Sequence, residues 1–217
     1  MPTLDRDGEV FVLNLGDGEN RFDADTVKQI SNALEEVAMA DGPRALVTSA
    51  TGKYFSNGLD LEWLAANQDE WKPFVDAVHQ MMARALSLPA PTAVAIQGHA
   101  FAAGAMLTLT HDWLVMRADR GFWCLPEVDI GLPFTPAMDA LIGSRLPRRT
   151  AHEAITTGRR YGAPEALEAG IIDATAPDGG ELAAAVERVG PLAGKAGPTL
   201  GAIKETFHSW ALQALRA

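Results

Sequence analysis

The sequence has few of the features that mark secreted, metal-binding or membrane proteins. A single cysteine, Cys124, among 217 residues excludes an internal disulfide and any cysteine-rich metal site. No apolar run approaches the roughly 20 residues that span a bilayer, and the first residues lack the basic-then-apolar pattern of a secretory signal. We therefore expect a cytoplasmic protein without a bound metal, in which Cys124 is a small buried hydrophobic residue.

Basic residues are also scarce relative to acidic ones. The chain carries 18 Lys and Arg against 28 Asp and Glu, which gives a formal net charge of -10. Such a field repels nucleic acid and anionic membrane surfaces, so we expect neither as a partner. A small anionic ligand would need a local basic patch.

The length of 217 residues and the hydrophobic content of 47% predict a single domain with a sizeable core. Short apolar strands are predicted at 9–15, 44–50, 92–97 and 113–116. Helices are predicted at 23–40, at 69–88 and from Gly104 through His111, after the stretch that begins at Gly98. Strands that alternate with helices in this way indicate an α/β fold whose strands are covered on both faces.

The second half of the chain has a different composition. From Pro136 onward, alanine-rich helical segments alternate with glycines, with one short apolar piece at Gly170–Asp173. We interpret residues 1–135 as the α/β core and 136–217 as a mainly helical region of the same domain.

Two glycine-bearing stretches follow predicted strands, at Phe55–Asp60 and Gly98–Gly104. Ligands of α/β proteins collect where strands end and helices begin. The first stretch lacks the Gly-Lys-Ser/Thr ending of an ATP loop, and the second lacks the Gly-x-Gly spacing of a dinucleotide site. Small residues do let a backbone approach a ligand closely, and two N–H groups that converge on one oxygen would form an oxyanion hole.

An oxyanion hole needs a proton carrier or a nucleophile beside it. Neither Ser49 nor Ser56 stands in the Gly-x-Ser-x-Gly setting of a serine hydrolase. His99 and His111 are possible bases, but they fit a turn and a helix end equally well. Glu127 ends the apolar run from Phe122, where burial would raise its pKa toward a value useful for a base or acid; a solvated loop glutamate is the alternative.

Both glycine-bearing stretches resemble signatures of one family. Phe55-Ser-Asn-Gly-Leu-Asp-Leu61 resembles the first oxyanion segment of the crotonase (enoyl-CoA hydratase/isomerase) superfamily, and Ala95–Gly104 followed by Thr110-His-Asp112 resembles the second. Residues 143–173 are similar to the helices that follow in the family. Within the family, His111–Arg117 and Glu127–Leu132 look like the plant-type monofunctional Δ3-Δ2-enoyl-CoA isomerases.

The resemblance implies a crotonase-like spiral of β-β-α units with a helical C-terminal region, assembled into homotrimers or hexamers. It implies an acyl-CoA thioester as substrate and no separate cofactor, because coenzyme A is part of the substrate. The N–H groups of Leu59 and Ala103 would hold the thioester oxygen, and Glu127 would move the proton. The chain stops soon after Phe207, so we expect the final helices of the family to be short or missing.

The resemblance also implies substrate contacts around the two segments. The predicted substrate-binding residues are Lys53, Phe55, Ser56, Asn57, Gly58, Asp60, Gly104, Met106 and Lys204. Among the basic residues, Lys53, Arg117, Arg120 and Lys204 are the candidates for the CoA phosphates.

Met106 discriminates between activities of the family. Hydratases carry a glutamate at this place and polarise water between two carboxylates, whereas moving a double bond needs one base. The sequence therefore favours a single-glutamate isomerase of unsaturated fatty acyl-CoA in β-oxidation. An enoyl-CoA hydratase, another acyl-CoA enzyme of this superfamily and a non-catalytic acyl-CoA-binding protein are the alternatives.

Overall fold

The computed structural model describes residues 1–217 and contains two β-sheets. The larger sheet has the strand order β1-β2-β3-β5-β7-β9, and the smaller has the order β4-β6-β8. The strands of the larger sheet are β1 (Thr3–Asp7), β2 (Val10–Asn14), β3 (Ala45–Ser49), β5 (Thr92–Ile96), β7 (Trp113–Arg117) and β9 (Ala174–Ala176). Those of the smaller sheet are β4 (Tyr54–Ser56), β6 (His99–Phe101) and β8 (Trp123–Cys124). All pairings are parallel except that of β1 with β2.

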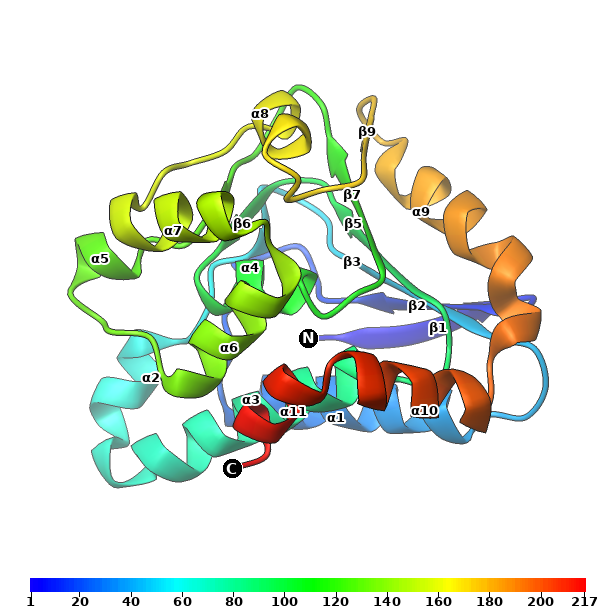
Figure 1. The fold of residues 1–217 in the computed structure, drawn as a ribbon, viewed down its shortest axis with the longest axis horizontal. Coiled ribbons are helices and arrows are strands. Elements are labelled where there is room, and N and C mark those ends of the chain that lie inside the picture. The colour runs from blue at the N-terminus through cyan, green and yellow to red at the C-terminus, as the bar shows by residue number, and fades with distance from the viewer.

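Successive strand pairs repeat one arrangement. In β3–β4, β5–β6 and β7–β8, the first strand joins the larger sheet and the second joins the smaller. Helices follow these pairs as α2 (Leu61–Ala66), η1 (Gln68–Glu70) and α3 (Trp71–Leu86), then α4 (Ala103–Thr108), then α5 (Glu127–Ile130). The chain thus winds as a spiral of β-β-α units (Figure 1), which confirms the predicted fold.

Local sequence explains the first long helix, α1 (Ala24–Met39). The Asp23 side chain accepts a hydrogen bond from the Thr26 N–H at 2.7 Å and so caps the helix, as an aspartate before a helix commonly does. Its buried side chains include Val27, Ile30 and Leu34, which recur at helical spacing. The predicted helix at 23–40 is confirmed.

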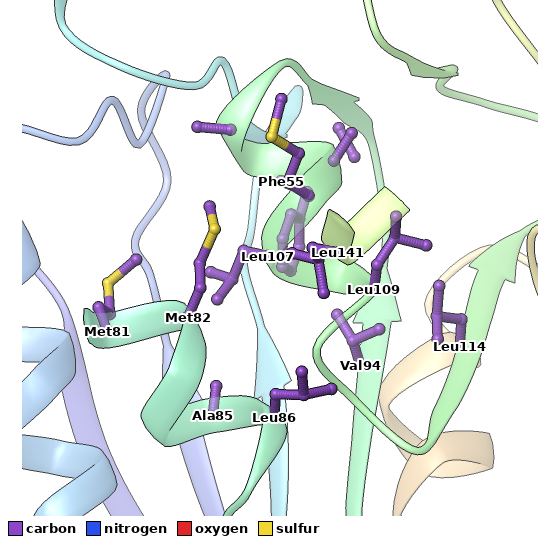
Figure 2. Close-up of a cluster of buried hydrophobic side chains, with 14 of the residues drawn as sticks. Phe55, Met81, Met82, Ala85, Leu86, Val94, Leu107, Leu109, Leu114 and Leu141 are labelled. Atoms are coloured by element: carbon purple, nitrogen blue, oxygen red, sulfur yellow. The ribbon is translucent and has the colours of Figure 1, made fainter. Parts of the chain in front are cut away.

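The core lies between the helices and the two sheets. Met82 and Leu86 of α3 belong to one buried cluster with Phe55 of β4, Val94 of β5 and Leu107 of α4 (Figure 2). Because Phe55 is fully buried in this cluster, β4 is anchored directly to the core just before the first glycine-bearing loop.

The second half of the chain is helical, as predicted, apart from β9. Its elements are α6 (Pro136–Arg145), α7 (Arg148–Thr157), α8 (Ala163–Glu168), α9 (Glu181–Val189), η2 (Gly190–Lys195), α10 (Pro198–Phe207) and α11 (Ser209–Leu215). α9 covers one face of the larger sheet, while α11 packs against α3 and α6 (Figure 1). The final helices, predicted to be short or missing, are present: α10 has 10 residues and α11 has 7.

The predicted helix from Gly104 through His111 is also too long. The helix ends at Thr108, and the hydroxyls of Thr108 and Thr110 donate to Ala105 O at 2.6 Å and Leu107 O at 2.7 Å. Side-chain hydroxyls that bond back to carbonyls in this way favour turns over a continuing helix. None of the helices combines the length and the apolar character needed to cross a membrane.

Candidate active site

A cavity of about 540 Å³ lies where the two glycine-bearing stretches meet α5 and the start of α6. Twelve of its 18 lining residues are hydrophobic. Asn57, Leu59, Ala103, Met106 and Glu127 all line it. The fold therefore brings together both predicted oxyanion donors and the predicted base, which are far apart in the sequence.

The Leu59 amide is oriented by a backbone bridge to Phe22. Phe22 N–H donates to Gly58 O, and Asp60 N–H donates to Phe22 O, each at 2.8 Å. In a parallel bridge, the residue between these two bonds turns its own N–H and C=O away from the partner strand. The Leu59 N–H accordingly points away from Phe22 and donates to no acceptor in the chain.

The Ala103 amide is the first of helix α4 and has no partner within the helix. The preceding residue, Ala102, has φ of +51°, which is uncommon for a residue with a Cβ. Ala102 is held there because its N–H donates to Cys124 O at 3.1 Å and its C=O accepts from Met106 N–H at 3.0 Å. The strained backbone is thus stabilised from both sides at the point where it sets the direction of the Ala103 N–H.

Two glycines, Gly58 and Gly104, allow the two glycine-bearing stretches to pack closely against each other. A Cβ at Gly58, whose φ is +84°, would lie 2.8 Å from Ala102 Cβ and 3.2 Å from Ala103 N. A Cβ at Gly104 would lie 2.6 Å from Ser56 Cβ. These distances leave no room for a side chain. Gly58 and Gly104 are therefore packing residues that bring the two amides to the same end of the cavity.

Glu127 is the only acid among the residues that line the cavity. Glu127 is the first residue of α5 and is 7% exposed. Its Oε2 atom is buried without a hydrogen-bond partner. Burial raises the pKa of the Glu127 carboxyl to about 7. A carboxyl with a pKa near neutrality can both accept and return a proton, so the position suits a general base.

The first glycine-bearing loop contains residues with different environments. Asn57 lines the cavity, and its side chain lies 3.4 Å from Glu19 Oε2. Asp60 caps α2, since its Oδ1 accepts from the N–H groups of Glu62 and Trp63. Phe55 and Ser56 are fully buried and do not line the cavity, so their predicted contact with substrate has no support in the geometry.

Lys204 lies elsewhere in the fold. Its Nζ donates to Ala90 O at 2.8 Å and to Asp112 Oδ2 at 2.7 Å, and the residue is 5% exposed. It lines a separate cavity together with Arg145 and His208. A lysine buried in an ion pair is not available to a phosphate, so the structure does not bring Lys204 to the predicted site.

Of the other basic candidates, Arg117 is paired with Asp119 and Asp178, whereas Lys53 and Arg120 have no acidic partner. Arg160, which was not among the predicted residues, lines the cavity, and its Cζ lies 5.7 Å from the Phe101 ring centre. Arg160 could have been found in the sequence, because Thr157-Gly-Arg-Arg160 belongs to the stretch that resembles the family.

Lys53, Arg120 and Arg160 lie around one histidine. Burial lowers the pKa of His99, and the positive charges of these three residues lower it further. Arg160 and Phe101 line the cavity, and the His99 ring centre lies 5.1 Å from that of Phe101, so the three cations form a local basic patch at one side of the cavity of an otherwise acidic protein.

Comparisons with known proteins show the family of the chain. The family model described as enoyl-CoA hydratase/isomerase matches residues 6–217. The chain belongs to this family. Its resemblance to the enoyl-CoA hydratase/isomerase family, inferred from the sequence, is thereby confirmed.

Individual members of the family differ in their described activity. The chain is 40% identical to peroxisomal enoyl-CoA delta isomerase 2 of Arabidopsis thaliana over 83% of this chain and 79% of that protein. It is 38% identical to enoyl-CoA delta isomerase 3 of the same plant, with the same coverage. The crystal structure of a probable enoyl-CoA hydratase from Mycobacterium tuberculosis superposes with a TM-score of 0.90 at 27% identity, over 99% of this chain and 91% of that one.

Proposed function

We propose that the protein is a Δ3-Δ2-enoyl-CoA isomerase, which moves a double bond from C3 to C2 of an unsaturated acyl-CoA. The observation that carries this proposal is that Glu127 is the one acid in a largely apolar cavity that also exposes two unpaired backbone amides. The names of the Arabidopsis relatives support the same activity. The proposed role is in β-oxidation of unsaturated fatty acids.

In the proposed reaction, the thioester oxygen accepts hydrogen bonds from the N–H groups of Leu59 and Ala103. The Glu127 carboxylate removes a proton from C2, and the electron pair of that C–H bond moves toward the carbonyl to form a dienolate. The two amides stabilise the negative charge that develops on the oxygen, each by a few kcal/mol.

Glu127 then returns its proton at C4. The C3–C4 double bond becomes a C3–C4 single bond, a new double bond forms between C2 and C3, and the carboxylate is regenerated. One group can serve both steps because its pKa of about 7 lets it gain and lose a proton at neutral pH.

The lining of the cavity disfavours hydration. Syn addition of water needs a second carboxylate to hold and polarise it, and Met106, which lines the cavity with an apolar thioether, offers none. An enoyl-CoA hydratase is therefore the second candidate, and a non-catalytic acyl-CoA-binding protein is the third.

The basic patch of Lys53, Arg120 and Arg160 is the proposed contact for the CoA phosphates. Its position beside the cavity supports this, since a chain with a net charge of -10 needs local cations to hold an anionic ligand. Lys204 and Arg117 are not proposed as phosphate contacts, because Lys204 is paired with Asp112 and Arg117 with Asp119.

A substrate panel tests the proposal. Purified protein is incubated with a 3-enoyl-CoA, and formation of the conjugated 2-enoyl product is followed by its absorbance; in parallel, loss of that absorbance from a 2-enoyl-CoA reports hydration. The isomerase proposal predicts the first reaction and little of the second. Hydration without isomerisation would replace it with the hydratase, and tight binding without proton exchange at C2 would support the non-catalytic alternative.

We also propose that the protein assembles as a homotrimer or hexamer. Ile203, Phe207 and Trp210 are 58%, 78% and 58% exposed along α10 and α11, and such a group of apolar side chains supports burial against another copy of the chain. Light scattering of the purified protein measures the assembly. The cytoplasmic location stays a prediction; the word peroxisomal belongs to the name of the Arabidopsis relative.

A further inference from the structure

The segment Glu19–Phe22 runs beside the loop that carries the Leu59 amide. Besides the two bonds of Phe22, Asn57 N–H donates to Glu19 O at 2.9 Å. Three backbone hydrogen bonds thus follow the loop from Asn57 to Asp60. Because they use the backbone groups on either side of Leu59, the position of this segment decides where the Leu59 N–H points.

Asn20 lies within this segment and ties it to β4, the strand that precedes the loop of Leu59. Its Nδ2 donates to Tyr54 O at 3.1 Å and to Phe55 O at 3.0 Å, and a third carbonyl, Gly16 O, lies at 3.2 Å. Its own backbone C=O accepts from Ser56 Oγ at 2.7 Å. The same hydroxyl accepts from Gly58 N–H at 3.2 Å, so Asn20 is connected through one side chain to the residue before Leu59.

The backbone of Asn20 also requires an unusual residue. Its φ is +50°, in the left-handed region, which asparagine adopts more readily than other residues with a Cβ. A glycine would adopt this conformation but would supply no side-chain donor. Asparagine therefore meets both requirements of the position, the backbone turn and the donor to β4.

We propose that Asn20 is a positioning residue for the oxyanion hole: its side-chain amide fixes Glu19–Phe22 against Tyr54–Ser56, and that placement directs the Leu59 N–H into the cavity. The inference rests on the proposed function. Asn20 does not line the cavity, and its side chain bonds only to backbone carbonyls, so we infer that it acts on the substrate through the position of Leu59.

Two substitutions separate this role from general stability. Asn20→Asp keeps the size of the side chain but replaces the donor with an oxygen that faces three carbonyls. Asn20→Gly keeps the positive φ and removes the side chain. Asp23→Ala is the matched control, because it removes the cap of α1 three residues away and leaves the loop bonds untouched.

Two measurements are made on each variant well below its unfolding temperature. The first is kcat and KM with a 3-enoyl-CoA. The second is the carbonyl stretching frequency of a bound 2-enoyl-CoA by difference infrared spectroscopy, which falls when the oxyanion hole polarises the thioester. We expect both Asn20 variants to lose about 10- to 100-fold in kcat, with a much smaller change in KM, as a misplaced catalytic group does. Their carbonyl frequency should move toward that of the free ligand, while Asp23→Ala should lower only Tm.

Asn20 variants with a lowered Tm but the wild-type frequency and kcat would overturn the proposal, since Asn20 would then be structural only. If neither variant folds, Asn20→Ser carries the same test with a smaller change, because it keeps a polar side chain but lacks the amide that donates to Tyr54 O and Phe55 O. Failure of the proposed function gives a different result: wild-type protein without isomerase activity. The carbonyl frequency of bound ligand still reports on Asn20 in that case.

Discussion

The substitution Glu127→Gln tests whether the ionised Glu127 carboxylate destabilises the folded protein. The Glu127 carboxyl has a folded-state pKa of about 7 against an ordinary value of 4.5, because burial disfavours its charge. A raised pKa means that the folded protein binds the proton more tightly than the unfolded chain does. The stabilising contribution of the protonated group is therefore complete below pH 4.5 and is lost as pH rises to 7.

The size of the effect follows from the two pKa values. Integrating the difference in bound protons between pH 5 and pH 8 gives a loss of about 2.5 kcal/mol in the wild type. Gln cannot ionise, so the Glu127→Gln variant does not lose this free energy of unfolding as the pH rises. We expect the free energy of unfolding of Glu127→Gln, relative to wild type, to increase by about 2–3 kcal/mol between pH 5 and pH 8.

Urea unfolding of both proteins at several pH values measures this difference, and the titration of every other group cancels in the subtraction. Activity is followed on the same samples. The variant should lose turnover yet keep acyl-CoA binding, and the wild-type kcat/KM should rise about tenfold per pH unit below 7 and level off above it. A stability difference that does not change with pH would refute the buried, charge-disfavouring environment inferred for Glu127.

Three other substitutions test the remaining site assignments. Gly58→Ala places a Cβ 2.8 Å from Ala102 Cβ, and we expect the displaced loop to lower kcat by about 100-fold with KM less affected, in steady-state kinetics. Lys204→Met leaves Asp112 without its buried partner and should lower the free energy of unfolding by about 3 kcal/mol. The KM for acyl-CoA should stay unchanged in this variant, and a raised KM would return Lys204 to the list of phosphate contacts. Arg160→Ala should raise KM and weaken its dependence on salt, because a cation of the basic patch is lost; an unchanged salt dependence would remove Arg160 from CoA binding.

Local signals explain why much of the fold could be predicted. The helix α1 has a capping aspartate and apolar residues at helical spacing, and the parallel strands β3 and β5 are short runs of buried residues. Both signals act over a few neighbouring positions, so they are readable in sequence. The strands β4, β6 and β8 were missed because two or three residues are too few to show a period.

The sequence alone determined the two glycine-bearing segments and the glutamate that follows an apolar run, and the family resemblance added that Met106 stands where hydratases carry a glutamate. These features depend on residue type, since only glycine leaves room for a backbone and only an ionisable side chain carries a proton.

Tertiary structure decided which of these groups work together. Burial of Glu127, the ion pair of Lys204 with Asp112, and the direction of the Leu59 N–H all depend on residues far away in the chain. Desolvation and hydrogen-bond direction arise only when distant segments pack against one another, so the apolar run before Glu127 left both a buried and a solvated glutamate open.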